Sequence, residues 1–145
     1  MNYLSNSIYA LGVILSIFFY EITGISPGGI IVPAYFMMYL DRYEIIVATI
    51  LVSVITLCMV KFISNYAILF GKRKFSLMAM VSVIIGYVFT YLPVQYMGQY
   101  IPVIGYIIPG ILAYEMDKQG SLRTLSSLLI VALVLKFLVI IIESV

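Results

Sequence analysis

Long stretches without a charged residue divide this chain and limit what it can fold into. These charge-free runs cover residues 1–20, 22–40, 45–60, 62–71, 75–114 and 124–135. A helix needs about 20 apolar residues to cross the hydrocarbon core of a bilayer. Segments of about that length lie at 4–20, 44–62, 75–92 and 122–142. The sequence therefore predicts an all-α integral membrane protein, with residues 1–145 forming a single transmembrane domain.

Composition excludes several other classes of protein. The chain is 64% hydrophobic and 10% charged, whereas soluble domains average about 45–50% and about 25%. It has no His and a single Cys, which excludes a disulfide framework, a His/Cys metal site and a histidine-based catalytic triad. No G-x-x-x-x-G-K-[ST] loop is present, and a net charge of +2 gives no reason to expect nucleic acid. We predict no cofactor, no metal and no catalytic residue.

Two further apolar segments, 24–40 and 101–116, are short and are interrupted by Gly and Pro. Both contain the pattern G-x-x-x-P. A proline inside a helix clashes with the carbonyl group four residues back, and in both segments that residue is a glycine. The pattern predicts two helices broken within the membrane, with a free carbonyl group at each glycine. The residues concerned are Gly29 and Pro33 in the first segment, and Gly105 and Pro109 in the second.

The two broken segments resemble each other. Residues 25–34 align with residues 101–110 at an offset of 76, and the same offset aligns the acid–base pair that follows each segment, Asp41-Arg42 with Asp117-Lys118. We therefore predict two pseudo-symmetric halves, each composed of a helix, a broken helix and a helix. The halves are residues 1–71 and 75–145, joined by a basic turn at 72–74. Chance similarity between two apolar segments is the alternative.

Two topologies fit this organisation. In one, the broken segments cross the membrane, which gives about six spans and an inverted repeat. In the other, they are re-entrant and only four helices cross. Cytoplasmic loops are enriched in Lys and Arg, and the crossing arrangement gives five cytoplasmic cations against one external cation, whereas the re-entrant arrangement gives three on each side. The charge distribution favours crossing with an external N-terminus, although a 14-residue helix of about 21 Å is short for a span.

Several cations are candidates for a functional site. Lys61 and Lys136 interrupt apolar stretches, and charges within a membrane usually serve a purpose. One interpretation is that Lys61 lines a path for an anion. The alternative is that its helix leaves the hydrocarbon near Val60, with the lysine stem snorkelling to the interface.

Four stretches together resemble the poly-γ-glutamate biosynthesis protein C family, of the PgsC/CapC type. The first is E-I-T-G-I-S-P-G-G-I-I-V-P-A-Y at 21–35, followed by F-G-K-R-K-F at 70–75. The others are G-Y-I-I-P-G-I-L-A at 105–113 and D-K-Q-G at 117–120. Their order and spacing extend the resemblance over essentially the whole chain. One departure is Ala34, where glycine is as common in the family.

The resemblance implies a non-catalytic, multi-pass subunit of the bacterial cytoplasmic membrane, within the complex that makes and exports poly-γ-glutamate for capsule or slime. Its implied partners are a B-type ligase subunit, which performs the ATP-dependent ligation, and a membrane-anchored A-type subunit. Membrane lipid and the anionic polymer are further partners, and a homo-oligomer is compatible with this role. The resemblance implies no catalytic residue.

The residues suggest how such a subunit would act. A polymer with one carboxylate per unit needs cations and oriented dipoles to pass through lipid. The predicted path residues are Gly29, Pro33, Gly105, Pro109, Lys61, Lys118, Arg123 and Lys136. A second predicted site, for docking the ligase, the polymer or anionic lipid, consists of Lys72, Arg73 and Lys74. A small oligomeric transporter for acidic solutes and a scaffold that only anchors the ligase are the alternative functions.

Overall fold

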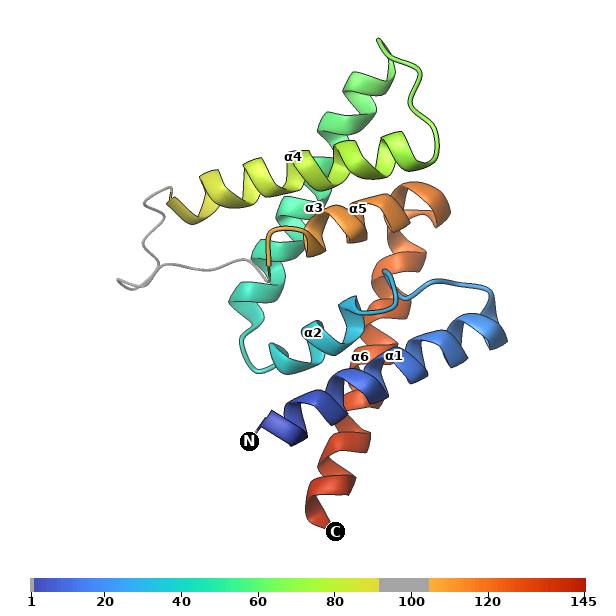
Figure 1. Ribbon diagram of the computed structural model, residues 1–145, viewed down its shortest axis with the longest axis vertical. Helices are drawn as coiled ribbons and strands as arrows, with labels where there is room; N and C mark the ends of the chain where they lie inside the picture. The colour runs from blue at the N-terminus through green and yellow to red at the C-terminus, as the bar shows by residue number, and fades with distance from the viewer. Residues whose placement is uncertain (1, 92–104) are drawn as a thin grey trace.

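The described part of the chain consists of helices joined by short connections. The computed structural model describes residues 2–91 and 105–145 (Figure 1). Within these residues there are six helices and no strand, so the predicted all-α class is confirmed. Residues 101–104 of the second predicted broken segment lie outside the described residues. The helices are α1 (Asn2–Thr23), α2 (Val32–Met38), α3 (Tyr43–Ser64), α4 (Lys72–Tyr91), α5 (Ile108–Gln119) and α6 (Ser121–Ser144).

Four of these helices, α1, α3, α4 and α6, are long and apolar enough to cross a membrane. They coincide with the four predicted spans. Their outward faces carry large apolar side chains that are more than half exposed, among them Ile14, Phe18, Ile84 and Phe137. An exposed apolar surface of this extent is unusual for a protein that is surrounded by water.

The two broken segments differ from the sequence-based expectation in how they break. Pro33 is the second residue of α2, and Pro109 is the second residue of α5. A proline at the start of a helix removes no hydrogen bond, because the first N–H groups have no partner within the helix. The prediction that each proline distorts a helix that already contains the glycine is therefore wrong. Gly29 and Gly105 precede the helices, with φ angles of +116° and +53°.

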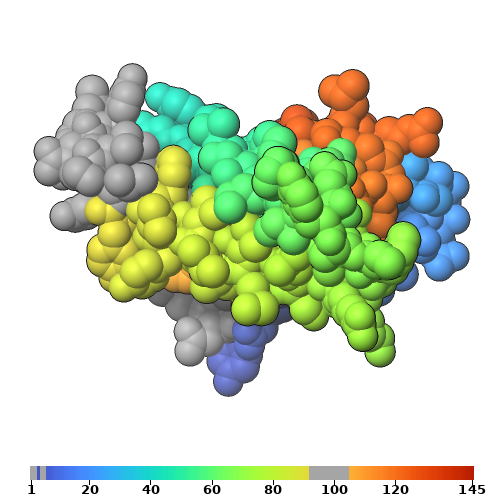
Figure 2. All heavy atoms as spheres, turned by 90° about the horizontal axis from the view of Figure 1, so that it is seen from above, coloured from blue at the N-terminus to red at the C-terminus, as the bar shows by residue number. Residues whose placement is uncertain are grey.

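The basic residues at 72–74 also differ from the prediction. They form the first turn of α4 and not a connecting turn, and residues 65–71 make the connection from α3. Cations at a helix N-terminus are repelled by the positive end of the helix dipole, so the first turn of α4 needs another source of stabilisation. Seen from above, α4 lies beside the C-terminal end of α3 (Figure 2).

The helices run in opposed pairs. Figure 1 shows α1 antiparallel to α4, α2 antiparallel to α5, and α3 antiparallel to α6. The packing contacts also occur in matching sets: α1 on α2 and α4 on α5, α2 on α6 and α5 on α3, α1 on α6 and α4 on α3. The contact of α5 with α6 has no counterpart of similar extent between α2 and α3. The helices of the two halves are thus intertwined.

The core forms around the two short helices. Five of the seven residues of α2 are buried, and Phe36 of α2 and Leu112 of α5 are fully buried. Two close contacts bring these helices against their neighbours. A Cβ added at Gly12 in α1 would lie 2.6 Å from Cβ of Ala34, and one added at Gly110 in α5 would lie 2.9 Å from the carbonyl oxygen of Met78. Such close approach through small residues is typical of helices that pack in lipid.

Candidate functional site

The first break is an eight-residue stretch, 24–31, that forms no helix. Its backbone groups find partners nearby. Gly24 donates its N–H to the carbonyl oxygen of Tyr20 at 2.8 Å, and Ile25 donates to the hydroxyl of Thr23 at 3.2 Å. The N–H of Gly29 donates to the Ser26 hydroxyl at 3.2 Å. Pairing of this kind is needed wherever an irregular backbone is shielded from water.

The most unusual contact joins this stretch to the other half of the chain. The Gln119 side-chain oxygen accepts a hydrogen bond from the Ser26 N–H at 2.9 Å, and the Gln119 amide nitrogen donates to the Ser26 carbonyl oxygen. The same nitrogen donates to the Thr124 hydroxyl at 3.1 Å. The Ser127 hydroxyl lies 3.1 Å from the Ser26 carbonyl oxygen, and its nearest acceptor is the Arg123 carbonyl oxygen in its own helix at 2.7 Å. We call Ser26, Gln119, Thr124 and Ser127 the Gln119 clamp.

Sequence reasoning missed the Gln119 clamp. Gln119 lies among charged residues at the end of a broken segment, where a polar residue is expected simply because the membrane ends. The only sequence signal was its position in the D-K-Q-G stretch. A contact between residues 93 positions apart depends on the fold, and no local pattern encodes it.

The second break is held by a different residue. Ser82 of α4 is fully buried and donates its hydroxyl to the carbonyl oxygen of Tyr106 at 2.9 Å, just before α5 begins. The same hydroxyl lies 2.9 Å from the Ala79 carbonyl oxygen. Both breaks are therefore held by a polar side chain from another helix.

The predicted path cations lie on three helices and have different surroundings. Lys61 is exposed in the last turn of α3, and Arg123 is exposed in the first turn of α6. Lys118 is exposed, with its amine 5.3 Å from the centre of the Tyr114 ring. Lys136 forms an ion pair with Asp41 at 2.6 Å.

No hydrogen bond or ion pair between described residues joins these four cations to the other predicted path residues, Gly29, Pro33, Gly105 and Pro109. Pro33 and Pro109 are both buried.

The predicted docking residues have two kinds of environment. Lys72 and Arg73 are exposed, whereas Lys74 forms an ion pair with Asp117 at 2.5 Å, with side chains that are 20% and 16% exposed. The carboxylate of Asp117 offsets part of the unfavourable positive charge at the start of α4. The ion pair also places the beginning of α4 directly beside the end of α5.

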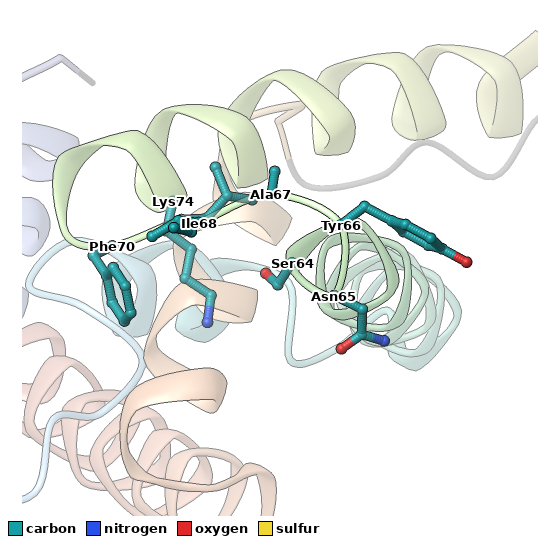
Figure 3. A pocket seen from close by; sticks show the side chains of 8 residues that line it. Ser64, Asn65, Tyr66, Ala67, Ile68, Phe70 and Lys74 are labelled. Carbon is teal, nitrogen blue, oxygen red and sulfur yellow. The ribbon is translucent and has the colours of Figure 1, made fainter.

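A pocket of about 540 Å³ lies next to this ion pair. Figure 3 shows the side chains of Ser64 and Lys74 directed into the space between the end of α3 and the start of α4. The Ser64 hydroxyl is buried and has no hydrogen-bond partner within the described part of the chain. The rest of the lining comes from the connection, residues 65–70.

Comparison with known proteins gives the family of the chain. The capsule biosynthesis CapC family matches residues 11–125. This chain belongs to that family. A CapC relative from Bacillus subtilis (strain 168), named PGA biosynthesis protein CapC, is 37% identical over 130 residues, which cover 84% of each chain. The capsule biosynthesis protein CapC of Bacillus anthracis is 30% identical over 130 residues, with the same coverage. No solved structure matches this CapC chain.

The match confirms the resemblance found in the sequence. The CapC region spans both breaks, the Ser26 stretch and the D-K-Q-G stretch, and ends just after Thr124. It therefore includes Gln119 and Thr124 of the Gln119 clamp but not Ser127.

Proposed function

We propose that this CapC family member is a non-catalytic membrane subunit of a complex that makes poly-γ-glutamate and exports it for capsule or slime. Its relatives are named for capsule and PGA biosynthesis. The structural observation that carries the proposal is the pair of interrupted segments packed among long apolar helices. Interrupted segments at corresponding positions of two halves often mark a transport path.

In this proposal the chain lies in the bacterial cytoplasmic membrane as an inverted repeat, with halves 1–71 and 75–145. The antiparallel pairs of helices and their matching contacts support this arrangement. The ion pair between Lys74 and Asp117 supports crossing segments, because the re-entrant arrangement would put these two residues on opposite sides of the membrane.

The length of the first broken segment is also compatible with crossing. Residues 24–31 form no helix, and an extended residue can advance by up to about 3.3 Å, whereas a helical residue rises by about 1.5 Å. Figure 1 shows this stretch and α2 returning alongside α1. A short helix preceded by an unwound stretch can therefore span a distance that the helix alone could not.

The polymer path in this proposal follows the two breaks. Backbone dipoles near Gly29 and Gly105 would face the polymer, and its carboxylates would be balanced by cations. Lys61, Lys118, Arg123 and Lys136 are the proposed cations. Pro33 and Pro109 fix the points at which α2 and α5 begin.

The proposed partners are a B-type ligase subunit and an A-type membrane-anchored subunit. The ligase would dock on the exposed side chains of Lys72 and Arg73 at the cytoplasmic end of α4. Docking there would bring newly made anionic polymer close to the ends of α5 and α3. A homo-oligomer would also suit the exposed apolar faces.

Replacing Lys72 and Arg73 together by Gln tests this docking surface. Lys74 is kept, because its loss would break the ion pair with Asp117. We expect polymer output from cells to fall about tenfold, as steering by opposite charge is lost, while the amount of protein in the membrane is unchanged.

Arg42→Gln is the matched control, since Arg42 is an exposed cation directly before the start of α3. It should leave polymer output unchanged. Normal output from the double variant, at a normal protein level, would contradict the docking proposal.

A further inference from the structure

Two cations at the start of α4 have no counter-charge within the described part of the chain. Lys74 is paired with Asp117, but Lys72 and Arg73 form no ion pair with any described residue. All six acidic residues of the chain lie in the described part. Because the N-terminal end of a helix carries partial positive charge, an anion from outside the chain would stabilise the first turn of α4.

A groove of about 360 Å³ lies beside these two cations, which is within the range of about 300–1,000 Å³ that is typical of small-ligand sites. The cations lie in the first turn of α4, and Met80 lies eight residues beyond Lys72, or about 12 Å along the helix. The groove therefore has a cationic end and an apolar end, and no acidic described residue lines it. The lining residues are Leu69, Lys72, Arg73, Ser76, Leu77 and Met80.

The groove opens away from the rest of the protein. The buried residues of α4 are Met78, Ser82 and Gly86, and a Cβ added at Gly110 of α5 would meet two of them. Met80 lies about 200° around the helix from Met78 and is 63% exposed. Figure 2 shows α4, in yellow-green, at the surface of the molecule. In a membrane, this outward face of α4 would meet lipid.

We infer that the groove binds an anionic phospholipid, with the phosphate between Lys72 and Arg73 and an acyl chain along Leu77 and Met80. Such a lipid has a negative head group followed by an apolar chain, which is the order in which the groove presents cations and apolar side chains. The proposed orientation places this lipid in the cytoplasmic leaflet, whose surface is negatively charged by anionic lipids. A chain of poly-γ-glutamate has no apolar part of this kind and would leave Leu77 and Met80 uncovered.

Lipid binding goes beyond the proposed function and is compatible with it. The phosphodiester of phosphatidylglycerol carries one negative charge, whereas Lys72 and Arg73 together carry two positive charges. One positive charge therefore remains for the proposed docking of the ligase.

Fluorescence quenching is a direct test, because the chain contains no tryptophan. Met80→Trp places a single tryptophan at the apolar end of the groove. The purified protein is reconstituted into phosphatidylcholine vesicles with increasing fractions of brominated phosphatidylglycerol or brominated phosphatidylcholine, whose chains quench tryptophan on contact. We expect phosphatidylglycerol to bind about tenfold more tightly than phosphatidylcholine, because each of two cations attracts anionic lipid several-fold. Replacing both Lys72 and Arg73 by Gln should abolish this preference.

Ile14→Trp is the matched control for the position of the tryptophan. Ile14 of α1 is also 63% exposed, and it lines a groove of about 440 Å³ that has no charged residue among its described lining. The two brominated lipids should quench a tryptophan equally at this position. A similar preference for phosphatidylglycerol at both positions would overturn the inference, because the cations of α4 would then not select the lipid.

Equal quenching by the two lipids at position 80 would also overturn the inference, as would a preference that survives the loss of both cations. Added poly-γ-glutamate or ligase subunit should not relieve the quenching by brominated phosphatidylglycerol. Relief would mean that the polymer or the ligase occupies the groove, and lipid would be rejected as its occupant. None of these results would remove the proposed capsule function, which is measured separately as polymer output from cells.

Discussion

Replacing Gly28 by Ala is expected to destabilise the protein by about 3 kcal/mol. Gly28 has a φ of +83°, where an L-residue is strained by about 1–2 kcal/mol. A Cβ there would also lie 2.8 Å from Cδ1 of Leu112. Leu112 is fully buried, so its side chain would have to repack within the core, and overpacking of this kind costs about 1–3 kcal/mol. Denaturant unfolding in detergent micelles measures the loss.

Gly24→Ala is the matched control for this variant. Gly24 lies in the same unwound stretch and also has a positive φ, +68°, but a Cβ there would meet nothing within 4 Å. It should therefore show only the backbone strain, about 1 kcal/mol. Equal losses for the two variants would mean that the first broken segment is not packed against α5 as described.

The second large effect is expected at Gly110. A Cβ at this position would lie 2.5 Å from the Ser82 hydroxyl and 2.9 Å from the Met78 carbonyl oxygen. The carbonyl belongs to the backbone of α4, so α5 would have to move away from α4 and the hydrogen bond from Ser82 to Tyr106 would be lost. We expect Gly110→Ala to lower the free energy of unfolding by about 3 kcal/mol.

A double variant separates the two clashes. Ser82→Ala removes the hydroxyl but leaves the Met78 carbonyl in place. The double variant Gly110→Ala with Ser82→Ala should lose less stability than the sum of the two single variants, because Ser82→Ala removes the hydroxyl with which the methyl added at position 110 clashes. Strict additivity in unfolding measurements would contradict the close packing of α4 against α5.

The long helices can be predicted well from the sequence, because the length of a charge-free apolar stretch is enough to identify them. A stretch of about 20 residues without a charge must be shielded from water, and a helix pairs its own backbone. The positions of the two breaks were also predictable, since Gly and Pro change the backbone wherever they lie. How the breaks are built was not predictable. Proline starts a helix as readily as it bends one, and only the packing around Pro33 and Pro109 selects between these outcomes.

The residues that hold the breaks were harder to find. Gln119 and Ser82 are ordinary polar residues in the sequence. Each holds a break in place only through a hydrogen bond to a backbone group far away in the sequence. The ion pair of Lys74 with Asp117 is similar. In the sequence, Asp117 belongs to the acid–base pair that follows the second broken segment and Lys74 belongs to the predicted docking site. The pattern of charges along a chain does not show which of these residues pair in space.

Thiol labelling tests the central claim, that both broken segments cross the membrane. In a Cys58→Ser background, single cysteines replace Arg42, Lys72 and Arg123, and spheroplasts are treated with a membrane-impermeant maleimide. Crossing predicts labelling at position 42 alone, with positions 72 and 123 labelled only after the membrane is permeabilised. Labelling of position 123 from outside together with position 42, while position 72 stays protected, would contradict crossing and show that the segments are re-entrant.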